Sequence, residues 1–330
     1  MYVLNSDITI GEYAFQGVHE VTIQRSLNNL ASTAVIKVPV SAVIHRTGES
    51  HSEDLVANHI QVGDPVRIRL GYDLRMHEEF RGYVKSLNLK SPLEIVCEDA
   101  FYLTRYRRVT LSGTKTLQEV LQACSLTVAA AETLTLRNFV GKDKSVGGVL
   151  ASLKTEYGLA VYFDLQGRVY AVRKDRAHSE DIVVYDLAQN IVDTDDLIYQ
   201  KAEDIHISIR AIAYLRDGNK IVATKGVEDY PQQTLYFYNV ADLTELSTLA
   251  EIELGRLAYE GYRGQLTAFL EPFAAPGMLA IVKDERYAGR TKYGTYIIDS
   301  VETTFGQQGA RRKVEIGCKI VTEAKSRPKR

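Results

Sequence analysis

Short stretches of alternating apolar and polar residues follow one another closely along about the first hundred residues, with no helical pattern between them. In the clearest stretch Val66, Ile68 and Leu70 face one way, while Arg67 and Arg69 face the other. Strands spaced this closely pair as antiparallel hairpins, which predicts a β-barrel or a β-sandwich. The expected strands cover residues 13–15, 18–24, 33–39, 66–72, 79–84 and 93–98.

A weak internal repeat links the two ends of the chain. The segments GDPVRI (63–68) and FRGYVKSL (80–87) resemble PGMLAI (276–281) and YGTYIIDSV (293–301). In both copies one glycine opens a strand, and a second glycine near the start of the next strand permits close backbone approach. We interpret the repeat as two copies of one barrel with another domain between them.

Between these ends the pattern changes to helical periodicity. Thr116 and Glu119 form a capping-box motif at the start of one helix. A second helix is expected from Ser145 to Gly158, a residue suited to a C-terminal cap. With a hairpin over residues 159–163 and 168–172, these helices predict a small α+β domain.

Strands return from about residue 191, and one helix, capped by Asp242 and Glu245, interrupts them. Residues 205–209 alternate before a turn at 217–219, so His206 is interpreted as outward-facing polar surface. Residues 236–238 (Tyr-Phe-Tyr) also alternate like a strand. The remaining strands are expected at 264–270, 277–282, 294–298 and 312–320.

The fold class predicted from these patterns is β-rich α+β, with two antiparallel β-barrel domains and a small α+β domain between them. The expected boundaries are 1–103 for the first barrel, 104–190 for the α+β domain and 191–330 for the second barrel.

The composition is that of an ordinary globular protein, since 45% of the 330 residues are apolar and 25% are charged. A net charge of −2 gives no general attraction to nucleic acid or anionic membranes. The basic clusters are Arg105 with Arg107 and Arg108, residues 311–313 and residues 325–330, and none is interleaved with aromatics in a recognition pattern. We therefore expect no membrane binding and no sequence-specific nucleic-acid binding. No apolar run is long enough to span a bilayer, and the N-terminus does not resemble a signal peptide.

The three cysteines, Cys97, Cys124 and Cys318, are odd in number and far apart. Each lies on an apolar face of an expected element. They are interpreted as buried thiols of a protein made in a reducing cytoplasm.

Three of the seven histidines fall in the stretch HRTGESHSEDLVANH (45–59). His45, His51 and His59 stand six and eight residues apart, which matches neither a helical ligand pair nor a zinc finger. We therefore expect no metal site here and interpret the stretch as a polar connection between strands.

No other motif predicts catalysis or a cofactor site. The glycines after Ser145 lack the lysine of a phosphate-binding loop, so helix packing explains them better. Carboxylate pairs occur at Glu78-Glu79, Glu98-Asp99 and Asp195-Asp196, and such pairs are usually solvated surface or turn residues. The twenty tyrosines are interpreted as strand core and interface residues. We predict a scaffold and not an enzyme, with no catalytic, cofactor-binding or metal residues.

The order of these patterns resembles the baseplate hub proteins of contractile phage tails, a family that includes phage late-control D proteins and the hub half of type VI secretion spike proteins. The likeness covers nearly the whole chain. It rests on residues 63–72, 80–84, 94–99 and the helix at 116, then on residues 150–164, 196–199, 262–267, 276–277 and 294–296.

This resemblance implies two tube-type barrels per chain and a homotrimer whose six barrels form a pseudo-sixfold ring around a channel through which DNA can pass. The implied partners are the tail tube protein, the spike and other baseplate proteins, in a particle assembled after synthesis in a bacterial cytoplasm. Because the chain ends at Arg330 without a spike domain, the spike is expected to be a separate polypeptide. In tube-type barrels the connection at 45–59 reaches neighbouring subunits, and residues 52–59 can form a short helix with Leu55, Val56 and His59 on one side.

Two other functions remain open at this stage. One is a cell-wall hydrolase of the same tail, which would use carboxylates, and the other is a carbohydrate-binding β module, which would use tyrosines. Neither accounts for the repeat at the two ends of the chain.

Overall fold

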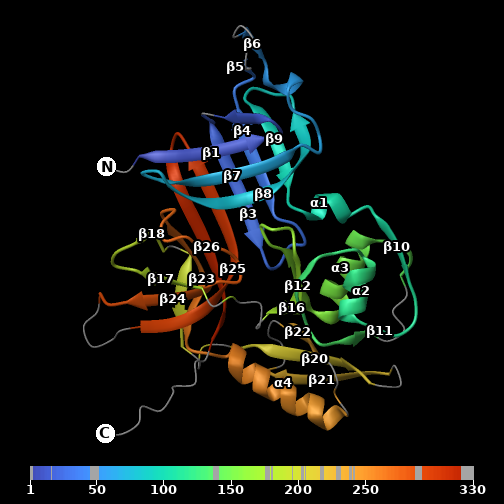
Figure 1. Ribbon diagram of the computed structural model, residues 1–330. Coiled ribbons are helices and arrows are strands. Elements are labelled where there is room, and N and C mark those ends of the chain that lie inside the picture. Colours follow the sequence, from blue (N-terminus) through green and yellow to red (C-terminus); the bar gives the residue numbers. More distant parts are fainter. Residues whose placement is uncertain are drawn as a thin grey trace, which may run out of the picture.

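The computed structural model describes residues 3–15, 17–44, 52–136, 141–174, 179, 181–194, 196–201, 204, 206–215, 219–227, 232–237, 240, 242–286 and 292–320. Its main feature is one large, mostly antiparallel sheet built from both ends of the chain (Figure 1). The N-terminal strands of this sheet are β1 (Leu4–Ile10), β2 (Tyr13–Phe15), β3 (Glu20–Ser26), β4 (Thr33–Val38), β7 (Pro65–Tyr72), β8 (Arg75–Asn88) and β9 (Leu93–Glu98). The C-terminal strands are β17 (Ile182–Asp186), β18 (Ile191–Asp193), β19 (Leu197–Gln200), β23 (Gly261–Ala268), β24 (Leu279–Asp284), β25 (Lys292–Gly306) and β26 (Gly309–Lys319).

The alternation of apolar residues decides which faces of the N-terminal strands are buried. Val66, Ile68 and Leu70 are at most 2% exposed, whereas Arg67 is exposed and Arg69 partly so, as predicted. Strand β1 was missed because its sequence LNSDITI contains only two clearly inward apolar residues at its end. It pairs antiparallel with β7 along its whole length.

The internal repeat is present in the backbone hydrogen bonds. Strands β7 and β8 form one antiparallel hairpin, and β24 and β25 form another. A glycine with positive φ precedes the first strand of each hairpin by two residues. Gly63 precedes β7 with φ 96°, and Gly277 precedes β24 with φ 85°. In both copies the glycine and the residue after it form a pair of backbone hydrogen bonds with one residue of the second strand. In the first copy, Gly63 N donates to Val84 O (2.8 Å) and Val84 N donates to Asp64 O (2.9 Å). In the second copy, Gly277 N donates to Ile298 O (2.9 Å) and Ile298 N donates to Met278 O (2.9 Å).

The two copies differ at their second glycine and at their outer strand. A Cβ atom on Gly82 would lie 2.2 Å from the carbonyl oxygen of Glu98, so close backbone approach is confirmed there. A Cβ atom on Gly294 would instead lie 2.4 Å from the hydroxyl of Tyr296, so this glycine makes room for a side chain. In addition, β1 runs antiparallel to β7, whereas β17 runs parallel to β24.

The α+β unit forms as the helical pattern predicts (Figure 1). Thr116 makes both bonds of the capping box with Glu119, Ser145 caps α3 through the amide of Gly148, and Gly158 ends α3 in the left-handed conformation at φ 64°. The elements of this unit are α1 (Phe101–Thr104), β10 (Arg108–Leu111), β11 (Lys115–Thr116), α2 (Leu117–Ala123), β12 (Val128–Ala131), β13 (Thr135–Leu136), β14 (Gly141–Ser145), α3 (Val146–Tyr157), β15 (Leu159–Phe163) and β16 (Val169–Arg173).

A second small unit lies within the C-terminal part, where the residue pattern alone predicts a single barrel domain. Strands β20 (Ser208–Tyr214), β21 (Lys220–Gly226) and β22 (Gln232–Phe237) form their own sheet, packed against α4 (Leu243–Leu257). Asp242 caps α4 through the amide of Glu245, as predicted. Phe237 is buried in this core, while Ile205, Tyr238 and the turn at 217–218 lie outside the described residues. His206 is exposed but precedes β20 instead of lying in a strand.

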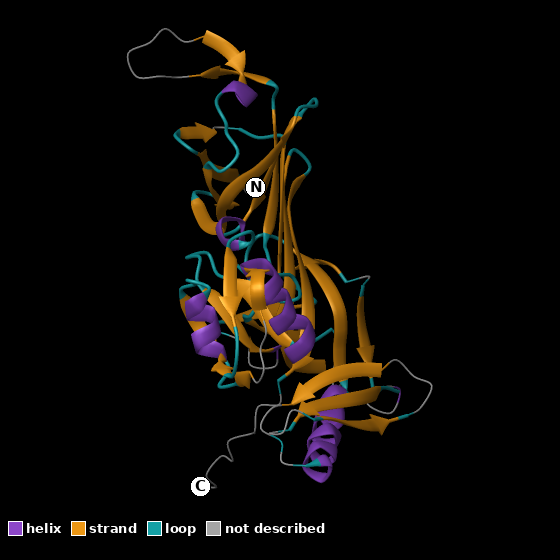
Figure 2. Ribbon diagram, turned by 90° about the vertical axis from the view of Figure 1, so that its right-hand side faces the viewer, coloured by secondary structure: helices purple, strands orange, loops and turns teal. Residues whose placement is uncertain are grey.

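The two ends of the chain are joined into a single sheet by β3 and β25. The second half of β25 pairs with all of β3, which places the strands in the order β18-β23-β26-β25-β3-β4-β9-β8-β7-β1-β2. The long strands that span the molecule are visible in Figure 2. Phe305 and Ala310, from the C-terminal end of the chain, pack in the same core as the N-terminal strands. The β-rich α+β class is therefore confirmed, while the two separate barrels and the boundaries at 103 and 190 remain predictions.

Candidate functional site: the junction of the two sheet halves

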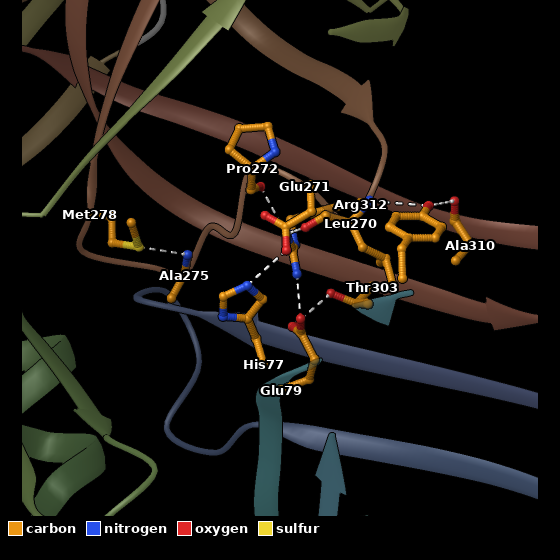
Figure 3. Close-up of polar contacts among 11 residues, drawn as sticks. His77, Glu79, Leu270, Glu271, Pro272, Ala275, Met278, Thr303, Ala310 and Arg312 are labelled. Atoms are coloured by element: carbon orange, nitrogen blue, oxygen red, sulfur yellow. Dashed lines mark hydrogen bonds and ion pairs between the residues drawn. The ribbon is translucent and has the colours of Figure 1, made fainter. Parts of the chain in front are cut away.

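A buried ion pair joins the two halves of the sheet. Glu79 in β8 and Arg312 in β26 are 1% and 0% exposed, and Nη2 of Arg312 donates to Oε1 of Glu79 (Figure 3). Nη1 of Arg312 donates to the carbonyl oxygens of Leu270 and Pro272, the latter at 2.9 Å. The hydroxyl of Thr303 donates to the other Glu79 oxygen at 3.5 Å. Acceptors from two segments, β8 and residues 270–272, thus fix one guanidinium at the junction.

The burial of Glu79 corrects the expectation that this carboxylate pair lies on the surface. The pairing of β7 with β8 shifts register between Ile68 and Arg69, where Phe80 and Glu78 are the respective partners, so Glu79 is the extra residue of a bulge. The bulge turns Glu79 inward next to Phe80, which a strict period of two does not predict. Burial raises the pKa of Glu79, and the charges of Arg312 and Arg25 oppose that effect.

Arg312 belongs to the basic cluster at 311–313, yet it is buried. It is the largest fully buried side chain among the described residues, and its guanidinium lies 5.1 Å from the ring centroid of Phe273. Beside it, at the surface, His77 stacks on Phe273 with ring centroids 4.8 Å apart, and its Nε2 lies 2.8 Å from Oε1 of Glu271, at hydrogen-bond distance. The junction therefore combines the buried Glu79–Arg312 ion pair with the solvent-exposed contact between His77 and Glu271.

The second carboxylate pair is buried as well, against expectation. Asp99 is 3% exposed and accepts bonds from the amides of Ser32 (2.6 Å) and Phe101 (3.0 Å), which holds the turn into α1. Burial raises its pKa to about 6. Glu98 is 5% exposed and forms ion pairs with Arg105 and Lys85. Both carboxylates have structural partners at a strand end, where the chain leaves the sheet.

The remaining carboxylate pair agrees with its surface interpretation as far as it is described. Asp195 lies outside the described residues. Asp196 is exposed and accepts bonds from Gln265 at 2.7 Å and Lys313 at 3.2 Å.

The described part of the histidine stretch, residues 52–59, lies at one end of the molecule, where β5 (Ser41–Ile44) and β6 (Ser52–Leu55) project beyond the sheet (Figure 1). Strand β6 is followed by the short 3-10 helix η1 (Val56–Asn58), so the expected helix over 52–59 forms only at its end. The strand pairing with β5 takes priority over the helical pattern. Val43 and Leu55 are 54% and 49% exposed on these two strands.

His45 and His51 lie outside the described residues, so the expected absence of a metal site remains a prediction. His59 contacts the Tyr13 hydroxyl through Nδ1 at 3.2 Å and Asp54 through Nε2 at 2.8 Å. Within the described ranges there is no group of three or more His, Cys, Asp or Glu side chains that could hold a metal ion.

The cysteines follow the prediction at two of three positions. Cys97 and Cys124 are buried, and burial raises the pKa of their thiols to about 12 and about 11 respectively. Cys318 is only partly buried, because it lies near the end of β26. No disulfide bond joins any two of the three cysteines.

Gly147, the first glycine after Ser145, has the helix-packing role that the sequence indicates. A Cβ atom on Gly147 would lie 3.0 Å from the carbonyl oxygen of Arg105 and 3.1 Å from the ring of Phe101, so the glycine lets α1 approach α3. No helix in the described part of the chain is both long and apolar enough to cross a membrane.

The fold is similar to those of phage tail proteins. The 43 kDa tail protein of prophage MuSo2 from Shewanella oneidensis matches with a TM-score of 0.58 and 15% identity, over 94% of this chain and 97% of the other. A tail protein from Neisseria meningitidis matches with a TM-score of 0.62 and 12% identity, over 97% of both chains. An E. coli component of the type VI secretion system, itself structurally similar to the bacteriophage T4 tail proteins gp27 and gp5, matches with a TM-score of 0.56 and 10% identity, over 96% of this chain and 77% of the other.

At the level of sequence, no family model and no curated protein matches this chain. The structural matches nevertheless confirm the resemblance inferred from the residue patterns. The chain has the fold of phage tail and type VI secretion tail-related proteins.

Proposed function

We propose that this chain is the structural baseplate hub of a phage or phage-like contractile tail. Three copies form a ring of pseudo-sixfold symmetry that joins the tail tube to a separate spike protein and leaves a central channel. The observation that carries the proposal is the repeat, because the hairpins that begin at Gly63 and Gly277 share their backbone hydrogen bonds. Two similar halves per chain give a trimer six similar wedges for a sixfold partner, while their differences keep a threefold face.

The buried junction supports this role. A hub that transmits force between tube and spike needs its two halves to move as one body. The Glu79–Arg312 pair, with the continuous pairing of β3 and β25, links the halves through charge, hydrogen bonds and a shared core. The hub is proposed to be a scaffold and not an enzyme, made in a bacterial cytoplasm and assembled into a tail baseplate with the tube, spike and other baseplate proteins.

The outer strand β17 is the proposed contact between neighbouring copies. It pairs only with β24 among the described strands, and its outward residues Ile182 and Val184 are 55% and 42% exposed. An open strand edge with apolar side chains invites pairing or aggregation in an isolated subunit, and closure of a ring would cover it.

The test is the mass of the purified protein across a concentration series, by native mass spectrometry and light scattering, with and without tube protein. We expect a trimer that grows from monomer with concentration, and particle images that show a ring with a central hole. Replacement of Ile182 and Val184 by lysine should shift the equilibrium to monomer. The matched control Val222→Lys, on the separate sheet of β21, should leave it unchanged.

A stable two-fold dimer, or a strict monomer in the presence of tube protein, would contradict the hub proposal. Turnover of purified peptidoglycan would support the cell-wall hydrolase instead. Selective binding on a glycan array would support the carbohydrate-binding module. Four tyrosines that such a module could use are core residues at most 9% exposed, which are Tyr185, Tyr259, Tyr262 and Tyr296.

A further inference from the structure

A cavity of about 250 Å³ lies where three parts of the chain meet. Arg25 and Ser32 line it from the N-terminal strands, Tyr162 and Tyr170 line it from the hairpin of the α+β unit, and Pro276 lines it from the start of the C-terminal repeat. Beside the cavity, a small apolar cluster joins the same three parts through Leu27, Ala160, Val172 and Ile297. A ligand in this cavity would therefore contact the N-terminal strands, the α+β unit and the C-terminal repeat.

Arg25 is the unusual residue of the cavity. Its Nη1 atom is shielded from solvent and has no hydrogen-bond partner among the described residues. Arg105 and Arg312 also leave Nε unpaired, but each donates to a carboxylate through another nitrogen. Burial lowers the pKa of Arg25, opposed by the charges of Glu79 and Asp99, yet arginine remains protonated in proteins. A solvent-shielded guanidinium nitrogen without an acceptor is costly, so an acceptor supplied from outside would be stabilised at Nη1 of Arg25.

The shape and charge of the surroundings define the acceptor. Tyr162 and Tyr170 stack with ring centroids 4.8 Å apart and planes at 7°, which gives the cavity one flat wall. Asp164 also lines the cavity, with its carboxylate paired to Arg168, and the charges of Glu79 and Asp99 act on Arg25. These acids disfavour a dianion such as phosphate more than a monoanion, and the planar guanidinium matches the two oxygens of a carboxylate.

We propose that this cavity is a binding site for a single carboxylate group, anchored by Arg25. The group can come from a free small carboxylate or from an acidic side chain of a polypeptide. The site rests on the cavity and its unpaired guanidinium, and it does not depend on the hub function.

The test is saturation-transfer NMR of the full-length protein with acetate, with inorganic phosphate and with a blocked Gly-Glu-Gly peptide, at constant ionic strength. Thermal unfolding in acetate against chloride gives a second readout, since a ligand that binds only the folded state raises the melting temperature. We expect acetate to bind, and Arg25→Gln to weaken it roughly tenfold or more, as for loss of a charged hydrogen bond.

Two further variants keep the test valid if Arg25→Gln fails to fold. Ala130→Leu fills part of the cavity, keeps the guanidinium and should abolish binding. Arg67→Gln, at an exposed arginine of β7 outside the cavity, should bind acetate like the unchanged protein. Stronger binding of the peptide than of acetate would identify a polypeptide source, and equal or weaker binding a small-molecule source. The proposal is overturned if acetate does not bind, if phosphate binds better, or if Ala130→Leu and Arg67→Gln behave alike.

Discussion

At the scale of single residues, the junction shows how one inserted position changes the role of a side chain. Glu78 and Glu79 are adjacent and chemically identical, yet Glu78 forms surface ion pairs with Arg67 and Arg81, while Glu79 is buried against Arg312. The bulge in β8 makes this difference. The two carboxylates therefore provide a matched comparison of a surface and a buried ion pair.

We expect Glu79→Gln to lower the free energy of unfolding by about 3–5 kcal/mol, because it leaves Arg312 charged and buried without a counter-charge. Glu78→Gln removes only exposed pairs and should cost about 1 kcal/mol or less. Chemical denaturation of both variants measures the difference. Equal losses would show that the buried pair contributes nothing beyond its surface neighbour.

Asp99 predicts a pH dependence. Its pKa of about 6 in the folded protein lies above the ordinary value of 3.8 for an aspartate, so the folded state holds the proton more tightly than the unfolded state. Its contribution to stability is therefore fully present below about pH 4 and is lost as the pH rises through about 6.

Relative to Asp99→Asn, the unchanged protein should lose stability between pH 4 and 6, by an amount on the order of 3 kcal/mol for a shift of about two units. Denaturation midpoints of both proteins, measured from pH 4 to pH 7, test this. Asp196→Asn, at an exposed carboxylate, is the control and should not show the same trend. Parallel curves for the unchanged protein and Asp99→Asn would contradict the assigned pKa.

At the scale of elements, the caps and strand alternation formed where the residue pattern places them. The capping box at Thr116 and the left-handed end of α3 at Gly158 depend only on residues within a few positions of each other, so local sequence specifies them. Local sequence does not specify close approach between strands, because the atom that a side chain in place of the glycine would meet belongs to another strand.

Gly82→Ala should destabilise the protein by about 1–3 kcal/mol, because the new methyl group would lie against the Glu98 carbonyl and force β8 away from β9. Gly255→Ala, in α4, has open space around it and should instead stabilise the protein by about 0.5–1 kcal/mol through helix propensity. Thermal unfolding of the two alanine variants measures the contrast. A stabilising or neutral Gly82→Ala would refute the tight packing of β8 on β9.

At the scale of the whole molecule, one continuous sheet carries two smaller units that have cores of their own. Among the described residues, the cores around α2 and α3 and around α4 share no buried residue with the core of the N-terminal strands. The α+β unit does touch the sheet through the cluster that contains Leu27 and Ile297. This arrangement indicates an appendage with a limited apolar contact.

Replacement of residues 116–172 by a short flexible linker should leave a folded, β-rich protein with a lower melting temperature, since Leu27 and Ile297 lose their partners. Circular dichroism and thermal unfolding of the deletion variant test this. Threonine at both positions in the same variant should improve its solubility without changing the strand signal. Complete unfolding of the deletion variant would show that the sheet depends on the α+β unit.

The sequence by itself determined the strands with regular alternation, the capped helices, the β-rich α+β class and the resemblance to tail proteins, because these depend on short-range patterns and their order. Only the tertiary structure decided that β3 pairs with β25, that Glu79 meets Arg312 across 233 positions of the chain, and that Arg25 faces a cavity. These features arise from a bulge and from contacts between distant segments. A period of two along one strand carries no information about either.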